Sequence, residues 1–511
     1  MKTSWRALVA VVLLAGFPVL VLLVVGGLAV AEYYAFRQSG LLAIKLGIVA
    51  VPVSFALLKA LFAIERTRGE DLPGVLVTPA DQPGLWALVR ELADTVGTRP
   101  PDAISLLNDV NAGVRERTGW LGLRVRRREM FIGAQLLAGL RHDQLRALLG
   151  HELAHYTNRD TRLAGLTYRG RRAIERALTG LAGDGWFEGL VRKLFVLYAK
   201  LYFVVSASVC RRQELAADAA AARLAGTAAA ASALREVEAL DVAWKYYLDH
   251  YLLVGWHAGY LPDRPAAGFR SLLADTGRAE QLDRLRRELP EEETSRYDTH
   301  PATPDRIAAL EAQPEVPGRP GGDRPASDVL RDADATLDAA LFADLATEAA
   351  AKRRTDWDSL VDLGFRHAAT KVAAAFLAGR TLDEALTLID EGHASEFADP
   401  DVRPPATAGP RAQREFVVAS VRENLSTMVA AALAEAGVAH WKLSWSGPAD
   451  LVVDEPHGSA LPAALDAAAA AGPDTAPLRR LLTTAGALPV RYGGDPCRCS
   501  TSSAARPRWR W

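Results

Sequence analysis

Residues 145–160 read LRALLGHELAHYTNRD, and this stretch contains the pattern His-Glu-x-x-His. Leucines recur at helical spacing before the pattern, so we expect a helix, with Asp143 as its N-terminal cap. One helical turn separates His151 from His155, so both imidazoles project from one face and can bind a single metal ion. Glu152 is placed to reach water at that metal without being a ligand itself. The alternative interpretation is a pair of ordinary surface histidines.

A catalytic metal site with two histidines needs a third protein ligand. Residues 211–218, RRQELAAD, close an apolar helical stretch and place Glu214 and Asp218 one turn apart. Two carboxylates on a face that points into a core require a partner, which a zinc–histidine site provides. We therefore expect Glu214 to be the third ligand and Asp218 to accept a hydrogen bond from a ligating histidine. A solvated acidic patch paired with Arg211 and Arg212 is the alternative.

The composition is that of an ordinary globular chain. The 511 residues are 50% apolar and include 60 basic and 61 acidic side chains. This length predicts about three folding units at roughly 150 residues per domain. A net charge of −1 gives no general attraction to phosphate, so we expect no nucleic-acid partner. Three cysteines are too few for a disulfide framework.

Two apolar stretches near the N-terminus predict a transmembrane helical hairpin. Residues 7–31 carry no charge, and at 1.5 Å per residue they exceed the roughly 30 Å thickness of the hydrocarbon core. The second stretch covers residues 41–64, and basic residues flank the pair at both outer ends. The positive-inside rule then predicts a cell-membrane protein with two spans and a cytoplasmic soluble part. The alternative is a signal peptide cleaved near residue 31, which would leave the second stretch as an anchor.

Helical periodicity dominates the rest of the chain. Residues 103–107 and 120–132 are rich in branched and aromatic side chains and predict strands of a small sheet. Residues 186–226 predict one long helical stretch, and its middle, residues 194–209, is strongly apolar. Sixteen residues interrupted by Lys200 are short for a membrane span. We therefore favour a buried or membrane-grazing helix there, with a third span as the alternative.

Four motifs together resemble the membrane zinc peptidases of the HtpX and CaaX-prenyl-protease type, over roughly residues 75–312. They occur in that family's order: Asn111-Ala112, the His-Glu-x-x-His segment, the Glu-x-x-x-Asp segment, and Thr299-His300-Pro301 followed by Arg306-Ile307. The resemblance implies a zincin-type peptidase domain with one zinc ion, the ligands His151, His155 and Glu214, and Glu152 as general base. Two features depart from the family pattern: Gly113 stands where an aromatic residue is usual, and the chain lacks a clear second membrane hairpin before Glu214.

The resemblance also implies roles for the outer motifs. Asn111 and Ala112 belong to an edge strand that would align the backbone of an extended substrate. We nominate His300 as a donor to the developing oxyanion, the alternative being a histidine that merely packs against Pro301. Arg306 is expected either to orient the site or to pair with a carboxylate.

The sequence thus predicts an α+β protein in which a mainly helical zincin-type metallopeptidase domain with a small β-sheet follows a transmembrane helical hairpin. The predicted parts are the hairpin, the peptidase domain, an α-rich C-terminal region of unknown role and a disordered tail, at residues 1–68, 69–315, 316–493 and 494–511. Proline and glycine in residues 316–326 predict a linker.

The expected function is that of a membrane-anchored zinc metalloendopeptidase whose partners are the lipid bilayer and a protein or peptide substrate. The family resemblance implies membrane or misfolded proteins as substrates. The alternative is a catalytically weak scaffold whose C-terminal region binds a partner protein. No motif indicates an oligomeric state.

Overall fold

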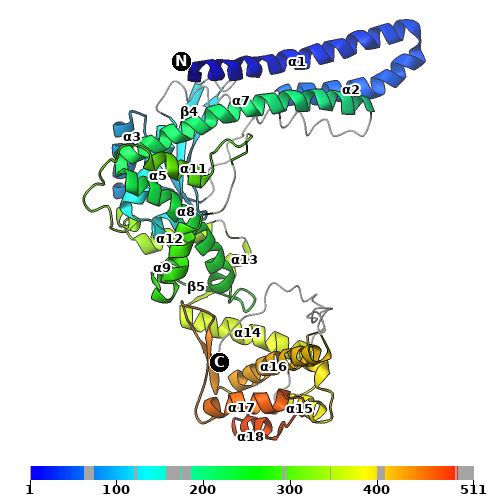
Figure 1. Cartoon of the computed structure of the whole chain (residues 1–511), viewed down its shortest axis with the longest axis vertical. Helices are drawn as coiled ribbons and strands as arrows, with labels where there is room; N and C mark the ends of the chain where they lie inside the picture. The colour runs from blue at the N-terminus through cyan, green and yellow to red at the C-terminus, as the bar shows by residue number, and fades with distance from the viewer. Residues whose placement is uncertain are drawn as a thin grey trace. The chain divides into compact units, whose positions relative to one another are not determined.

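A computed structural model divides the chain into two compact units, and each is described by itself (Figure 1). The first unit comprises Met1–Val242 and Leu282–Asp344, and the second comprises Ala243–Gln281 and Leu345–Trp511. Helices dominate and small sheets accompany them, which confirms the mainly helical α+β fold. The structure describes residues 2–62, 74–119, 124–156, 174, 186–289, 294–295, 297–343, 345, 347–399, 409–488 and 492. The tail predicted to be disordered lies outside these residues.

The first unit holds the N-terminal helices, a four-stranded sheet and the helices around it. Its elements are α1 Lys2–Gln38, α2 Gly40–Phe62, β1 Val75–Val77, α3 Pro83–Val96, β2 Ala103–Leu107, β3 Ala112–Gly119, β4 Arg124–Gly133, α4 Ala134–Gly139, α5 His142–Ala154, α7 Trp186–Ala225, α11 Thr303–Glu311, the 3₁₀-helix η3 Ala326–Val329 and α12 Ala333–Ala343. Two further helices, α8 Thr227–Tyr247 and α10 Ala279–Arg287, pass from one unit into the other.

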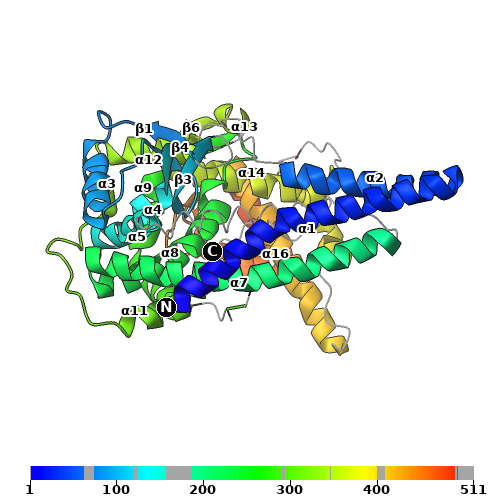
Figure 2. The same ribbon diagram turned by 90° about the horizontal axis from the view of Figure 1, so that it is seen from above.

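Helix α7 is continuous over 40 residues, and its apolar first half packs against α1 and α2 (Figures 1 and 2). The rings of Phe17 and Phe195 meet edge to face, with centroids 5.9 Å apart. Ile174 is buried in the same cluster. On the other side of α7, Leu197 and Leu201 are 68% and 53% exposed. The residues predicted to form a buried or grazing helix therefore pack on one face and expose leucine on the other.

The four-stranded sheet runs in the order β1-β2-β4-β3, with β2 and β4 parallel and the other pairs antiparallel. The predicted strand at 103–107 is confirmed. The predicted strand at 120–132 is confirmed from residue 124 onward, as β4, and residues 120–123 lie outside the described residues. Strand β3 forms one edge of the sheet. Composition gave no signal for β3, because Arg, Glu, Thr and Gly fill it instead of the branched residues typical of strands.

Helix α5 carries His151 and begins two residues earlier than predicted. Its N-cap is Arg141, whose backbone N–H donates to the side-chain oxygen of Gln144 at 2.8 Å. Asp143 is therefore inside the first turn and is not the cap. Leu145, Leu149 and Leu153 recur at four-residue spacing and are fully buried, so helical periodicity fixes which face of α5 points outward.

Residues 316–326, predicted to be a linker, are hydrogen-bonded to the first unit. The backbone N–H groups of His142 and Asp143 donate to the carbonyls of Arg324 and Gly322, at 2.8 and 2.9 Å. Helices leave their first N–H groups without partners inside the helix, and this segment supplies the missing acceptors. The proline and glycine content marked an irregular backbone correctly but did not reveal that the segment caps α5.

A partly buried ion pair ties α5 to α3. The Arg146 guanidinium, 6% exposed, donates to both carboxylate oxygens of Glu91 at 2.7 and 3.0 Å. Arg319 adds a third hydrogen bond to Glu91, at 2.9 Å. These contacts, chiefly the hydrogen bond from Arg146, lower the pKa of Glu91 to about 2.

We expect Glu91→Gln to destabilise the first unit by about 1–2 kcal/mol at pH 7, since the charge of Arg146 loses its partner but Glu91 itself is half exposed. The pKa of Glu91 is lower in the folded protein than in the unfolded chain. The contribution of Glu91 to the free energy of unfolding is therefore complete above about pH 4.5 and is lost as the pH falls towards 2. Thermal unfolding of parent and variant should differ at pH 7 and converge as the pH falls to about 2. A gap that stays constant would show that the ionised carboxylate is not responsible.

The second unit is α-rich. Its elements are the π-helix η1 Leu248–Leu252, β5 Tyr260–Pro262, α9 Pro265–Ala274, η2 Thr276–Arg278, α13 Thr347–Ala350, β6 Arg353–Thr355, α14 Trp357–Leu377, α15 Leu382–Asp390, η4 Ala394–Phe397, α16 Pro410–Glu435, β7 Ala439–Lys442, β8 Asp450–Val453, α17 His457–Ala469 and α18 Ala476–Thr484. Strands β7 and β8 form an antiparallel pair.

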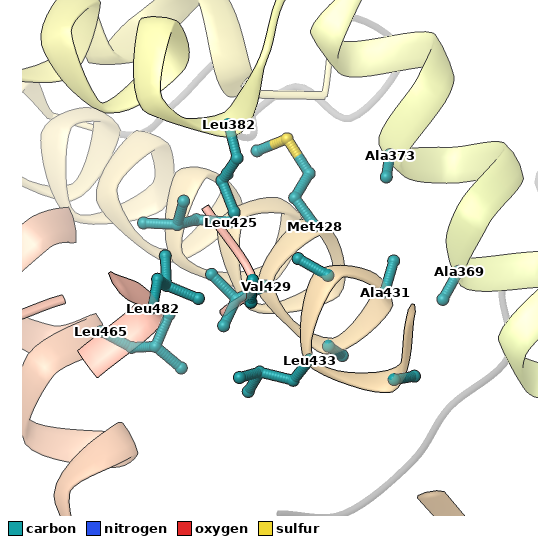
Figure 3. Close-up of a cluster of buried hydrophobic side chains, with 14 of the residues drawn as sticks. Ala369, Ala373, Leu382, Leu425, Met428, Val429, Ala431, Leu433, Leu465 and Leu482 are labelled. Carbon is teal, nitrogen blue, oxygen red and sulfur yellow. The ribbon is translucent and has the colours of Figure 1, made fainter. Parts of the chain in front are cut away.

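Helix α16 is the centre of the second unit's core (Figure 3). Leu425, Met428 and Leu433 are fully buried, and α14, α15, α17 and α18 contribute the surrounding side chains. Within the described part of the chain, three helices are long and apolar enough to cross a membrane, α1 over Val11–Gln38, α7 over Arg192–Ala225, and α16. Residues 428–434 of α16 are all apolar and fully buried in protein, so their hydropathy reflects a core position.

Candidate active site

His151 in α5, His155 at the C-terminal cap of α5 and a glutamate of α7 converge on one point. The Nε2 atoms of His151 and His155 are 3.1 Å apart. The Glu214 carboxylate oxygens lie 3.6 Å from Nε2 of His151 and 3.5 Å from Nε2 of His155. The two helices pack closely at this level, partly because residue 150 is glycine. A Cβ atom on Gly150 would lie 2.4 Å from Cδ1 of Leu224 in α7.

These distances suit a single metal ion. Ligand atoms held tetrahedrally at about 2.0–2.1 Å from zinc are about 3.3 Å from one another, close to the observed separations. Two imidazole nitrogens and one carboxylate oxygen are also a donor set that catalytic zinc sites use. All three ligand atoms lie within 4.8 Å of one another. The residues present therefore fit the metal that their spacing predicts.

Asp218 and Arg306 form a chain of contacts behind His151. An Asp218 carboxylate oxygen lies 2.9 Å from Nδ1 of His151. The Arg306 guanidinium donates to both oxygens of Asp218, at 2.7 and 2.9 Å. The side chains of Glu214 and Asp218 are only 8% and 4% exposed, so the alternative of a solvated acidic patch is wrong. Arg211 instead donates to a backbone carbonyl, that of Asp298, at 2.7 Å.

His300 contacts the third ligand candidate. Its Nδ1 lies 3.2 Å from a carboxylate oxygen of Glu214, while 69% of its side chain is exposed. The hydrogen bond to Glu214 raises the pKa of His300. The structure thus brings His300 into the cluster instead of leaving it to pack only against Pro301.

Residues 79–313 match the family model of peptidase family M48. These residues form an M48 peptidase domain. The family includes the HtpX and CaaX-prenyl-protease-type zinc metallopeptidases, so the resemblance inferred from the four motifs is confirmed. No solved structure matches the chain. The M48 domain is the part that contains the whole cluster described above.

Burial and neighbouring charges shift the titration of the cluster in the M48 domain. Burial lowers the pKa of His151, but the carboxylates of Asp218 and Glu214 outweigh it and raise that pKa to about 9. Burial raises the pKa of Glu152 to about 7, against the opposing effect of His151. Burial disfavours the protonated form of His155 and lowers its pKa to about 4. A bound cation would stabilise the ionised form of Glu152 and lower its pKa.

Asn111 and Ala112 lie outside the cluster, at the start of the M48 domain's edge strand β3. The carbonyl of Asn111 accepts a hydrogen bond from the N–H of Gly133, at 2.8 Å. The structure also explains the departure at Gly113. A Cβ atom there would lie 2.4 Å from the ring of Phe131 on the neighbouring strand, so the aromatic ring comes from β4.

Sequence reasoning missed Tyr156, the residue that follows His155. Its hydroxyl donates to the carbonyl of Val114 in β3, and its ring lies under the Arg128 guanidinium, 4.8 Å from the ring centroid. Its own carbonyl accepts a hydrogen bond from Thr98 at 3.0 Å. Neither spacing nor composition marks these contacts, because they join residues 42 and 58 positions apart. Tyr156 links the metal-site helix of the M48 domain to its edge strand.

Proposed function

We propose that this protein is a membrane-anchored zinc metalloendopeptidase. The observation that carries the proposal is the convergence of His151, His155 and Glu214 within 4.8 Å, with Glu152 next to His151 on the same helix. The match of residues 79–313 to peptidase family M48 supports it. We propose zinc over other metals because two histidines and one carboxylate form a ligand set typical of catalytic zinc.

Bound zinc supplies a Lewis acid that polarises the scissile carbonyl and makes a nearby water more acidic. Glu152 then acts as general base: it takes the proton of the attacking water and delivers it to the leaving amine. His300 is exposed beside Glu214, where its ring N–H can donate to the carbonyl oxygen as negative charge develops.

Asp218 and Arg306 position His151. The carboxylate of Asp218 accepts the hydrogen bond of Nδ1, which leaves Nε2 of His151 as the free, ligating nitrogen. Arg306 holds Asp218 by two parallel hydrogen bonds and compensates the charge of the buried carboxylate. Both expected roles of Arg306 are thus combined in our proposal, since pairing with Asp218 is the means by which it would orient the site.

Substrate would bind as an extra strand along β3. This strand lies at the edge of the sheet, and among the described residues one side of its backbone has no partner strand. Ala112 begins β3, and α5 packs against the same strand, which brings the edge close to the metal-site helix. Strand addition fixes an extended peptide through its backbone and therefore accepts many side chains. This suits unfolded or damaged proteins as substrates.

The membrane anchor in this proposal is α1 with α2, and the first half of α7 joins it. The apolar side chains that α1, α2 and α7 expose are of the kind that lipid covers, including Leu23, Ile48 and Leu197 at 68%, 69% and 68% exposure. Basic residues at the start of α1 and after α2 favour a cytoplasmic M48 domain. Glu214 lies in the same helix as Leu197, so α7 connects the anchor directly to the metal site.

Metal removal tests the proposal on the full chain in detergent. We expect one zinc per chain by elemental analysis and cleavage of casein, a protein with little folded structure. Dialysis against a chelator should abolish cleavage, and zinc should restore it when added back at about one equivalent. Zinc binding without cleavage would favour the scaffold alternative, in which the C-terminal region binds a partner protein. Cleavage that survives complete zinc removal would contradict the metal mechanism.

A further inference from the structure

The edge of β3 that has no partner strand among the described residues presents its backbone groups alternately. Val114 pairs with Met130 and Ala112 with Ile132, in antiparallel register. The Gly133 N–H donates to the carbonyl of Asn111, so residues 111 and 113 point their backbone groups towards β4. By the same alternation, the N–H and C=O groups of Ala112 and Val114 point away from β4. These are the groups that an added strand could use.

One of these outward groups already has a partner. The Tyr156 hydroxyl donates to the carbonyl of Val114. Ala112, by contrast, has no such contact from Tyr156 on its carbonyl. Among the described residues, the N–H and C=O of Ala112 and the N–H of Val114 remain for an added strand, whereas the Val114 carbonyl already accepts one hydrogen bond.

Several contacts hold Tyr156 in this position. Its backbone N–H donates to the carbonyl of Leu153 at 3.0 Å, and its carbonyl accepts from Thr98 at 3.0 Å. The guanidinium of Arg128 covers its ring and is itself fixed by Glu116 at 2.8 Å and by Thr98 at 3.0 Å. Arg128 is 8% exposed. The hydroxyl is thus aimed at β3 by a network that joins the sheet to the end of the metal-site helix.

We propose that Tyr156 sets the substrate specificity of the edge strand, by withholding the Val114 carbonyl from the substrate backbone. This rests on the proposed peptidase function and on substrate addition to β3. The substrate residue opposite Val114 then has no acceptor for its N–H. Peptides with proline or another residue lacking that N–H are accepted at this position, whereas the residue opposite Ala112, two positions away, needs its N–H. Tyr156 acts as a positioning residue and takes no part in proton transfer.

An ester scan of a cleaved peptide tests this inference. Each backbone amide is replaced in turn by an ester, which removes one N–H donor and keeps the side chain. With the parent protein, we expect an ester at the substrate residue opposite Ala112 to lower kcat/KM. An ester two residues away, opposite Val114, should leave kcat/KM unchanged. Tyr156→Phe frees the Val114 carbonyl, so a second sensitive position should appear there, with a fall of about 3- to 10-fold carried by KM.

Tyr251→Phe is the matched control, since the Tyr251 hydroxyl also donates to a backbone carbonyl, that of Ser444 at 2.9 Å, and lies in the second unit. It should leave the ester scan unchanged. Identical scans for parent and Tyr156→Phe would overturn the inference. So would a parent scan in which an ester two residues away from the sensitive position, opposite Val114, also lowers kcat/KM. That parent result decides the matter even if Tyr156→Phe does not fold. A parent that cleaves no peptide at all contradicts instead the proposed function.

Discussion

Replacing Glu152 by glutamine is expected to lower kcat/KM by about 10²- to 10⁴-fold while one zinc per chain stays bound. Glutamine has nearly the same shape but cannot accept a proton at neutral pH. Glu152 contributes no ligand atom to the group formed by His151, His155 and Glu214, so metal affinity should be kept. The measurement is peptide cleavage by the full chain in detergent, with zinc determined on the same sample.

Glu311→Gln is the matched control for this variant. Glu311 is 54% exposed and pairs with Arg235 on the surface of the first unit, so its change should leave both zinc content and cleavage intact. Cleavage by Glu152→Gln at parental rates would show that another group is the base. Loss of zinc from Glu152→Gln would instead show that the carboxylate helps to hold the metal, contrary to the ligand assignment.

The centre of the site could be predicted because helical geometry is local. A four-residue spacing places His151 and His155 on one face whatever the rest of the fold does, and the same holds for Glu214 and Asp218. The meeting of the two helices was expected only because buried carboxylates need a partner. The structure brings them together with ligand atoms 3.1–3.6 Å apart.

Contacts between residues far apart in the chain could not be predicted from the sequence. The segment at 316–326 looked like a linker because proline and glycine report only an irregular backbone, not what its carbonyls bind. Strand β3 was found only through the Asn-Ala resemblance, because its arginines and glutamate are not residues from which composition predicts a strand. Two of these arginines, Arg115 and Arg117, each lie 2.9 Å from the nearly buried carboxylate of Glu129, which explains how charged residues occupy this strand.

One long helix over residues 186–226, with the Glu-x-x-x-Asp segment at the end of its apolar stretch, was predicted, and α7 confirms it. The sequence did not show which elements each half of the helix packs against. Packing against α1 and α2 accounts for the apolar half, and packing against α5 accounts for the other. Because both halves are parts of one helix, a disturbance of the anchor can be transmitted to Glu214.

Glu214→Gln is expected to lower zinc content from one per chain towards zero and to abolish cleavage with it. The amide keeps the shape of the side chain, but it lacks the negative charge that attracts the ion and opposes the charge of the surrounding cations. Only His151 and His155 then remain as ligands, which is too few for a catalytic zinc site. Elemental analysis after exhaustive dialysis, followed by zinc titration, measures the loss.

The direction of this effect separates Glu214 from Glu152. Both are glutamates at the same site, yet the first should lose metal and activity together, whereas the second should lose activity alone. Excess zinc should therefore restore part of the cleavage by Glu214→Gln and none of that by Glu152→Gln. Full zinc occupancy in Glu214→Gln would place the third ligand elsewhere, and the nearest side chain to test next is His300, which lies 3.2 Å from Glu214.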